Sequence, residues 1–475
     1  MTVSAKHFMR RIKNIHFIGI GGAGMGGIAE VFHNLDYVIS GSDIAENSMV
    51  QHLRDLGIDV HIGHRSENID SVHVVVVSTA IDKDNAEIVA AREKRIPIVR
   101  RAEMLAELMR FRRGIAIAGT HGKTTTTSLV ASVLAQGDID PTYIIGGRLN
   151  SSASHAKLGL SDYLVAEADE SDASFLYLQP MMAVVTNIDQ DHLPAYEGDF
   201  GRLKRAFIEF LHHLPFYGLA IVCIDDPVVR EILGEIARPI LTYGESEDAD
   251  VRISAIRADG ARTKFSVVLP NQDQTFDIDL NMTGKHNALN ATAAIAVAWE
   301  LGVSREAMQV ALTEFSGIGR RFQISENVRV AAGKVMHIDD YGHHPVEIRA
   351  TLEAIREAWP EKRLSVVFQP HRYTRTRDLF EDFAQVLSEV DHLVLTEVYA
   401  AGENNIKDAD GRALARSIRV RGKIDPVFVE NLDALNEVVD SLLEDGDIFL
   451  TLGAGSIGAW STEFLAQSHR SGQGR

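Results

Sequence analysis

Short apolar runs alternate with amphipathic segments from the start of the chain. The runs IHFIGI (residues 15–20) and HVVVVSTAI (73–81) are apolar enough for buried strands, and GMGGIAEVFHNL (24–35) between them has helical periodicity. Buried strands that alternate with helices are typical of a parallel sheet with right-handed crossover connections. This first stretch therefore predicts an α/β domain.

The alternation begins a second time at GIAIAG (114–119). From about residue 250 it gives way to hairpin-like strands, FSVVLP and TFDIDL, and then to one long helical segment at 285–302. A third series of apolar strands starts near residue 320 and ends with DIFLTLGAG. The polar tail QSHRSGQGR (467–475) is expected to be disordered.

These three series predict the fold class: α/β with three domains, each built on a mostly parallel sheet. We expect a Rossmann-like N-terminal domain at residues 1–111, a P-loop ATPase-like central domain at 112–319 and a Rossmann-like C-terminal domain at 320–475. In open parallel sheets, ligands bind beyond the carboxyl ends of the strands. Most polar motifs of this chain fall at such ends, which points to a set of ligand sites there.

Composition narrows the class of protein. Of the 475 residues, 45% are hydrophobic and 24% charged, which is typical of a globular protein. The single cysteine, Cys223, excludes a disulfide framework and fits a reducing, cytoplasmic location. No apolar run approaches the roughly 20 residues that span a bilayer, so no membrane insertion is expected. A net charge of −18 argues against general nucleic-acid binding. The sequence leaves open whether the protein is a monomer or a homodimer.

The first glycine-rich motif directly follows a predicted strand. Gly19, Gly21 and Gly24 form G-x-G-x-x-G, and Asp43 closes the next predicted strand. Glycines at this spacing allow a tight turn and let the backbone approach a pyrophosphate, and the acidic residue is expected to bind a ribose hydroxyl. The motif indicates a diphosphate on a sugar without identifying the nucleotide. A glycine-rich turn that binds no ligand is the alternative.

The second glycine-rich motif is GTHGKT, residues 119–124. A full Walker A motif has a further glycine where this chain has Ile117, but Gly122, Lys123 and Thr124 retain the end that acts on phosphate. Backbone amides at a helix start hold phosphate, the lysine reaches the β- and γ-phosphates, and the hydroxyl suits Mg²⁺. The motif predicts an ATP site.

Acidic side chains follow the next two apolar strands of the central domain. Glu167, Asp169 and Glu170 come after the first, and Asp191 and His192 follow the second. Because the carboxyl ends of parallel strands meet at one edge, these groups are expected to converge on ATP and Mg²⁺. A simple dehydrogenase has no use for the second motif, and a simple ATPase has no use for the first. An enzyme that uses ATP to activate a nucleotide-linked substrate fits both.

A longer set of motifs resembles the Mur ligases of peptidoglycan synthesis in order and spacing. The motifs are GTHGKTTT, EADESD, TNI followed by DH, GKHNALNA, GIGRRF, DDYGHHP and QPHRYTRTRDL, and they cover nearly the whole chain. The resemblance implies one domain for the UDP-sugar, one for ATP and a third that brings in the amino acid. The first domain resembles that of the member joining L-alanine to UDP-N-acetylmuramate through an acyl phosphate, with ATP and Mg²⁺ as cofactors.

The resemblance also implies roles for individual residues. Those implied to bind the UDP-sugar are Gly21, Gly22, Gly24, Met25, Ser42, Asp43, Ser78, Arg101, Glu170 and Ser171. Those implied to bind ATP are Gly119, Thr120, His121, Gly122, Lys123, Thr124, Thr125, His286, Asn287, Asn290, Arg321 and Asp340. Those implied to bind the amino acid are Tyr341, His343, Arg372 and Arg375. Metal ligands would be Thr124, Glu167 and His192, and catalytic residues Lys123, His192, His343, Arg372 and Arg375.

Two positions depart from the family pattern. Pro194 stands where the family usually has an aspartate, and Phe207 where some relatives carry a carbamylated lysine. The nearby Lys204 is expected to be an ordinary surface helix residue.

Three alternative functions stay open at this point. One is the ligase that attaches a whole peptide to UDP-N-acetylmuramate in cell-wall recycling, which shares the first-domain pattern. Another is an NAD-dependent oxidoreductase, which rests on the first motif alone. The third is a nucleotide sensor without catalysis, against which the intact Lys123, Thr124, Glu167 and His192 argue.

Overall fold

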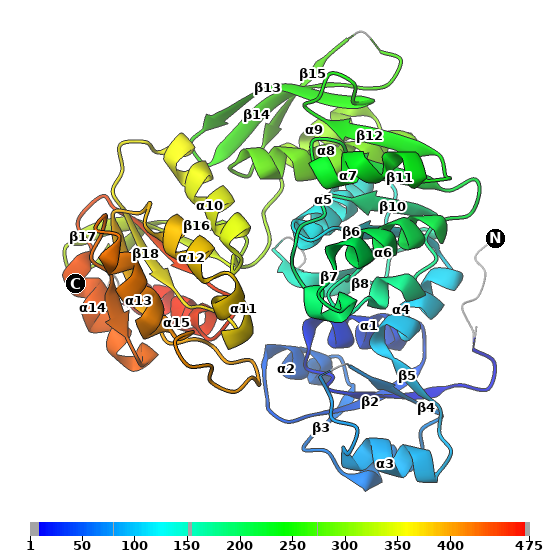
Figure 1. Cartoon of the computed structure of the whole chain (residues 1–475). Helices are drawn as coiled ribbons and strands as arrows, with labels where there is room; N and C mark the ends of the chain where they lie inside the picture. Colours follow the sequence, from blue (N-terminus) through cyan, green and yellow to red (C-terminus); the bar gives the residue numbers. More distant parts are fainter. Residues whose placement is uncertain (1–8, 79, 151–153, 273, 471–475) are drawn as a thin grey trace. The chain divides into compact units, whose positions relative to one another are not determined.

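A computed structural model describes residues 9–78, 80–150, 154–272 and 274–470. Packing divides the chain into two compact units. The first comprises Met1–Ala255, Phe265–Asp279 and Ala288–Ser316, and the second comprises Ile256–Lys264, Leu280–Asn287 and Gly317–Arg475. Three sheets organise the described residues (Figure 1). The predicted fold class is confirmed: the architecture is α/β and the sheets are mostly parallel.

The first sheet has five parallel strands in the order β3-β2-β1-β4-β5. The run of valines in β4 is buried because both faces of the sheet are covered. Val74 and Val76 pack with α1 and α4, whereas Val75 packs on the other face with α3. The elements are β1 (Asn14–Ile18), α1 (Ala23–Asn34), β2 (Val38–Asp43), α2 (Ser48–Asp55), β3 (Asp59–Ile62), β4 (Val74–Val77), α3 (Ala86–Glu93), β5 (Ile98–Arg100) and α4 (Arg101–Arg110).

The second sheet has the order β15-β14-β13-β12-β11-β10-β6-β9-β7-β8. Its parallel middle places β6 between β9 and β10, so the loop after β6 has a strand end on either side. The strands are β6 (Arg113–Ala118), β7 (Thr142–Leu149), β8 (Ser154–Lys157), β9 (Tyr163–Glu167), β10 (Met182–Val185), β11 (Leu219–Cys223), β12 (Ile240–Gly244), β13 (Val251–Asp259), β14 (Arg262–Val268) and β15 (Phe276–Leu280). The helices are α5 (Lys123–Gln136), α6 (Phe200–His212), α7 (Pro227–Ile232), α8 (Lys285–Glu300) and α9 (Arg305–Thr313).

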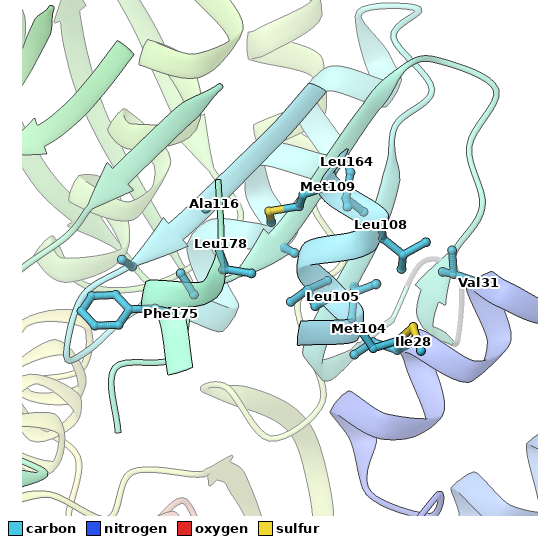
Figure 2. Packing of buried hydrophobic residues seen from close by; sticks show 14 of the residues in the cluster. Ile28, Val31, Met104, Leu105, Leu108, Met109, Ala116, Leu164, Phe175 and Leu178 are labelled. Carbon is cyan, nitrogen blue, oxygen red and sulfur yellow. The ribbon is translucent and has the colours of Figure 1, made fainter. Parts of the chain in front are cut away.

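One hydrophobic core joins the first sheet to the second within the first unit. Helix α4 lies between α1 and the central sheet, and its Leu105 and Leu108 belong to the same buried cluster as Ile28 of α1 and Leu164 of β9 (Figure 2). Gly27 allows α1 to approach β7 and β8, because a Cβ there would lie 3.3 Å from Ala156. The two glycine motifs are therefore carried by one packed body.

The third sheet has the order β16-β17-β21-β18-β19-β20, parallel except for the β16–β17 pair. The strands are β16 (Gln323–Val330), β17 (Gly333–Asp340), β18 (Leu364–Phe368), β19 (His392–Thr396), β20 (Val427–Val429) and β21 (Ile448–Leu452). The helices are α10 (Pro345–Ala358), α11 (Tyr373–Asp378), α12 (Phe380–Leu387), α13 (Gly411–Val420), α14 (Leu435–Leu442) and α15 (Ile457–Arg470).

The end of the chain differs from the expectation. The prediction of disorder is wrong for residues 467–470, because α15 continues through them to Arg470. Trp460 and Phe464 bury the apolar face of this helix, and that packing extends the helix into a polar end. The remainder of the predicted tail lies outside the described residues. Across the described part of the chain, no helix combines the length and the apolar character needed to cross a membrane.

Candidate active site

The first glycine loop, residues 19–24, joins β1 to α1. Gly19 has φ +79°, a conformation that favours glycine. The amides of Gly19 and Ile20 donate to the carbonyl oxygen of Ser42 at 2.8 and 3.1 Å, and the Gly21 amide donates to Oδ2 of Asp43 at 2.8 Å. The end of β2 thus holds the loop in place. The other oxygen of Asp43, which the sequence assigns to a ribose, accepts the Ala45 amide at 3.4 Å, so both carboxylate oxygens already bind backbone.

An arginine reaches the first glycine loop from α4. A Cβ on Gly24 would lie 3.2 Å from Nη1 of Arg101, so the glycine leaves room for the guanidinium. The same side chain lies 3.4 Å from Oδ2 of Asp169, at the end of the central domain's β9. Backbone amides and a guanidinium at the start of a helix suit a phosphate group.

Three other residues predicted at the sugar-nucleotide site surround the same loop. Gly22 is the N-cap of α1, and Met25 is buried in the core beneath it. Ser78 follows β4, and its Oγ would lie 3.9 Å from a Cβ on Gly19. The structure thus brings the predicted residues of the first domain together at one edge of its sheet.

The second glycine loop, residues 119–124, joins β6 to α5. Gly119 and Gly122 have φ +130° and +83°. A Cβ on Gly119 would lie 2.0 Å from Oγ1 of Thr186, and one on Gly122 would lie 2.6 Å from Oδ1 of Asn290. Both glycines are therefore required by close contacts as well as by backbone conformation. Asn290, a predicted ATP-binding residue on α8, lies directly against this loop.

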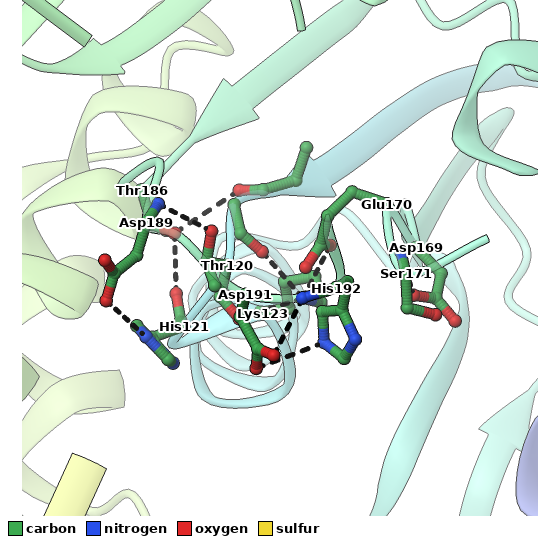
Figure 3. A network of polar contacts seen from close by, with 12 residues as sticks. Thr120, His121, Lys123, Asp169, Glu170, Ser171, Thr186, Asp189, Asp191 and His192 are labelled. Carbon is green, nitrogen blue, oxygen red and sulfur yellow. Dashed lines mark hydrogen bonds and ion pairs between the residues drawn. The ribbon is translucent and has the colours of Figure 1, made fainter. Parts of the chain in front are cut away.

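Lys123 is held beneath its own loop (Figure 3). Its Nζ donates to the carbonyl oxygens of Gly119 and Thr120 at 2.6 and 3.1 Å and to Oε2 of Glu170 at 2.7 Å. Burial opposes the charge of Lys123, but nearby carboxylates, chiefly Glu170, outweigh it and raise its pKa. All three donors of the ammonium already bind protein atoms, so a phosphate would have to replace one of them.

Glu170 is the most deeply buried acid at this edge. Burial raises its pKa to about 7, although the charge of Lys123 acts in the opposite direction. Its Oε2 binds Lys123, while its Oε1 is buried without a hydrogen-bond partner. The hydroxyl of Tyr196 donates to its backbone carbonyl at 2.5 Å. Next to it, the Ser171 amide donates to Oδ1 of Asp169 at 3.0 Å.

The predicted metal ligands lie at the ends of adjacent strands. Glu167 is in register with Ile117 of β6, and its Oε1 accepts the Gly146 amide at 2.7 Å. Thr124 and Thr125 lie buried in the first turn of α5. His192 follows β10 with φ +57°, and its Nε2 lies 3.4 Å from Oδ2 of Asp191.

The chemistry of these residues fits Mg²⁺ in part. Mg²⁺ prefers oxygen ligands and commonly takes one or two from protein, which Thr124 and Glu167 supply. An imidazole such as His192 is a less typical ligand for this ion. The set therefore suits a cation completed by phosphate oxygens and water.

Three residues at this loop carried no prediction: Thr186, Asn187 and Asp189. After β10, the Thr186 hydroxyl donates to the carbonyl oxygen of His121 at 2.7 Å, and the His121 amide donates to Oδ1 of Asn187 at 2.8 Å. The Asp189 amide donates to Oγ1 of Thr120 at 2.9 Å. These contacts fix the predicted Thr120 and His121. Polar residues directly after the buried run MAVV were the signal for them in the sequence.

In the second unit, Asp340 organises two loops. Its Oδ2 accepts the Phe322 amide at 2.7 Å and its Oδ1 accepts the Gly342 amide at 2.8 Å. Asp340 thus holds backbone next to Arg321, and both of its oxygens are in use. At the start of α8, Asn287 donates to the Thr283 carbonyl oxygen at 2.8 Å, and burial lowers the pKa of His286 despite nearby Asp340.

A series of rings lines the carboxyl edge of the third sheet. The guanidinium of Arg321 lies 4.8 Å from the centroid of the Tyr341 ring, which meets His343 at 5.4 Å. His343 meets His371 at 5.7 Å, and His371 stacks on Tyr399 at 5.6 Å. Burial, and then the charges of His343 and Arg375, lower the pKa of His371 to about 4. No role for His371 or Tyr399 follows from the sequence alone, although His371 lies in the motif QPHRYTRTRDL three residues after the end of β18.

The two predicted arginines of this edge sit on a constrained turn. Arg372 has φ +72°, a strained value for a residue with a side chain, and it precedes α11. Arg375 Nη1 lies 3.5 Å from Nδ1 of His371. Thr374 between them donates its amide and hydroxyl to Glu403 at 3.0 and 2.7 Å. The structure thus brings Tyr341, His343, Arg372 and Arg375 to one edge.

Comparison with known proteins agrees with this organisation. The chain matches models described as "Mur ligase family, catalytic domain" at residues 14–113, "Mur ligase middle domain" at 117–298 and "Mur ligase, glutamate ligase domain" at 320–455. The chain therefore belongs to the Mur ligase family.

Several relatives are similar over nearly their whole length. A UDP-N-acetylmuramate–L-alanine ligase of Halorhodospira halophila (strain DSM 244 / SL1) is 62% identical over 448 residues, which cover 94% of this chain and 92% of that protein. The solved UDP-N-acetylmuramate–alanine ligase of Thermotoga maritima has a TM-score of 0.82 and 31% identity, and the match covers 96% and 99% of the two chains. A murein peptide ligase of Psychrobacter arcticus 273-4 matches over 96% and 98% with a TM-score of 0.71, but at 24% identity it shows the fold alone.

Proposed function

We propose that this chain is an ATP-dependent ligase that joins L-alanine to UDP-N-acetylmuramate in peptidoglycan precursor synthesis. The observation that carries the proposal is that one packed unit holds two glycine loops, each of a kind that binds phosphate. Arg101 at the first loop lies 3.4 Å from Asp169, which follows β9 of the second sheet. The relatives named for this activity over nearly the full chain support it. The single cysteine agrees with a cytoplasmic location.

The proposed reaction has two steps. A carboxylate oxygen of the muramyl group attacks the γ-phosphorus of ATP, ADP leaves, and an acyl phosphate forms. The amine of L-alanine then attacks the acyl carbon, phosphate leaves, and the nitrogen loses a proton. Activation is required because a carboxylate is a poor electrophile at neutral pH.

Residues of the second glycine loop have the main electrostatic role. Lys123 is proposed to leave the carbonyl oxygens of its own loop and to bind the phosphates, which stabilises the transferring phosphoryl group. Thr124 and Glu167, with His192 as the third predicted ligand, would hold Mg²⁺, which neutralises phosphoryl charge when bound. Arg372 and Arg375, with Tyr341 and His343, are proposed to bind the amino acid, since a guanidinium suits a carboxylate.

Phosphate release tests the proposal directly. The assay combines UDP-N-acetylmuramate, ATP and Mg²⁺ with L-alanine, glycine, L-serine or an L-alanyl tripeptide. We expect release to require the sugar nucleotide and to be fastest with L-alanine. Lys123→Ala should lose the activity, whereas Lys204→Ala, which removes a 2.8 Å pair with Glu231 on α7 and a contact with the Phe200 ring, should retain it. Faster release with the tripeptide would favour the recycling ligase instead.

A further inference from the structure

A buried carboxylate lies under the first glycine loop without belonging to it. Glu87 of α3 is fully buried. Its Oε2 accepts the Ser42 hydroxyl at 2.6 Å, and its Oε1 accepts the Asn68 amide at 2.5 Å and the Arg65 backbone amide at 3.4 Å. The Glu87 side chain thus links β2 to the segment that follows β3.

Two histidines complete this network. Nδ1 of His64 lies 2.9 Å from Oγ of Ser42 and 3.3 Å from Oε2 of Glu87, and Nε2 of His16 lies 3.7 Å from the same carboxylate oxygen. Burial disfavours the charge of Glu87, but its interactions with His16, Ser42 and Asn68 outweigh burial and lower its pKa to about 2. An ionised carboxylate has no proton to donate, so every group bound to it must be a donor.

This constraint fixes where the protons lie. The single hydroxyl proton of Ser42 points to Glu87, and Oγ of Ser42 can then only accept from His64. His64 must therefore carry a proton on Nδ1, and in its neutral form Nε2 is left as an acceptor. The His64 ring is 15% exposed, at the carboxyl edge of the first sheet.

Ser42 connects this network to the first glycine loop. Its carbonyl oxygen accepts the amides of Gly19 and Ile20, the first two residues after β1. The next residue, Asp43, accepts the Gly21 amide through its side chain, and its carbonyl oxygen accepts the Gly63 amide at 2.8 Å. A shift of Ser42 would therefore move the backbone of the first glycine loop.

We propose that Glu87 is a positioning residue for the sugar nucleotide: through Ser42 and His64 it presets the first glycine loop before the ligand binds. Preset donors lower the cost of ordering the loop on binding. The inference rests on the proposed function, since it assigns that loop to UDP-N-acetylmuramate. Glu87 lies outside the glycine motif and is not among the residues that the sequence predicted for any binding site.

The first domain offers a matched control. Glu30 of α1 is also a buried acid, 6% exposed, and its Oε2 lies 3.1 Å from Nε2 of His52. This pair joins α1 to α2, whereas the loop is held by Ser42 and Asp43 of β2. Glu30→Gln therefore removes a buried acid beside a histidine in the same domain without changing the contacts of Ser42.

Calorimetry with UDP-N-acetylmuramate and with a non-hydrolysable ATP analogue tests the proposal on the full chain. Glu87→Gln should weaken sugar-nucleotide binding about tenfold, the size expected for losing a hydrogen bond to a charged group, and leave the ATP analogue unaffected. Glu30→Gln should change neither affinity. Ser42→Ala should cause a similar loss, and the double variant Ser42→Ala/Glu87→Gln should lose little more than either single variant, because both act through one contact.

A spectroscopic measurement separates positioning from general stability. Proton–nitrogen correlation of the imidazoles, with His64 assigned through a His64→Gln variant, should show Nδ1 protonated in the wild type and a mixture of forms in Glu87→Gln. Unchanged sugar-nucleotide affinity in Glu87→Gln, or an equal loss for both ligands, would overturn the proposal. If the wild type does not bind the sugar nucleotide, the proposed function fails. The hydrogen-bond network is tested separately, because an unprotonated Nδ1 of His64 in the wild type would refute it.

Discussion

Acid should selectively weaken the core of the C-terminal domain through His337 of β17. This side chain is fully buried against Phe449 and Phe464, and its Nε2 lies 3.1 Å from Oγ1 of Thr451. Thr451 donates its own proton to Asp339 at 3.0 Å, so Nε2 of His337 must be the donor. Nδ1 is then the basic nitrogen, and it is buried without a partner.

The size of the stability loss follows from the shift in the pKa of His337. Burial lowers the pKa of His337 from 6.5 to about 4. Because the folded-state pKa lies below the unfolded one, the unfolded chain binds the proton first, and stability is lost as the pH falls through this interval. Linkage gives a loss of about 2 kcal/mol between roughly pH 7.5 and pH 5 from this one group.

The nearby Trp460, which is 9% exposed, supplies the probe. In a background with Trp299→Phe and Trp359→Phe, its fluorescence would follow urea unfolding at both pH values. His337→Phe keeps an aromatic ring but cannot titrate, so its stability should fall about 2 kcal/mol less than that of the wild type over the same pH change. Val439→Ala, a change in the same core, should lower stability at both pH values without altering their difference. If wild type and His337→Phe lose equal stability on acidification, the reasoning is refuted.

Three further predictions test the two glycine loops and the metal site. Gly24→Asp should abolish UDP-N-acetylmuramate binding by placing a carboxylate against the diphosphate, while ATP binding persists; calorimetry showing the reverse would exchange the two assignments. Gly119→Ala should abolish phosphate release, because its Cβ would lie 2.0 Å from a neighbouring hydroxyl, whereas Gly57, which also has a positive φ (+87°), lies in open space, so Gly57→Ala should remain active. His192→Ala should strongly raise the Mg²⁺ concentration that gives the half-maximal rate. Pro194→Asp should lower this concentration by up to about 10–100-fold, the effect typical of a residue that hydrogen-bonds to metal ligands. If neither variant changes the Mg²⁺ titration, the metal site is wrongly assigned.

Local sequence was sufficient for the two glycine loops. A strand followed by glycines at fixed spacing encodes a turn within about ten residues, so the positions of Gly19 and Gly119 needed no tertiary information. The same holds for Glu167 and His192, because they follow β9 and β10, which flank β6 in one parallel sheet and end at the same edge. Their roles in binding stay predictions, since position alone does not identify a ligand.

Contacts between residues that are distant in sequence could not be predicted from local motifs. Asp340 has the appearance of a free acid at a strand end, yet both of its oxygens accept backbone amides, one of them 18 residues earlier in the chain at Phe322. Glu87 reads as an ordinary polar residue in the first turn of a helix, and nothing near it indicates that Ser42 will reach it across 45 positions. Such pairs arise from strand order, which amphipathic patterns do not encode.

The shared core between the first two sheets has a consequence for the chemistry. Phosphoryl transfer requires the attacking oxygen and the phosphorus to meet in line, and holding both reactants in that geometry supplies a large part of catalysis. A flexible linker between two binding domains would leave that alignment to chance encounters. Here α4 carries Arg101 at its start and buries Leu105 and Leu108 in a core that also includes Leu164 of β9. The helix that reaches the first loop therefore shares a core with the strand that ends at Glu167, and this hydrophobic packing sets the distance between the two loops that we propose to bind the reactants.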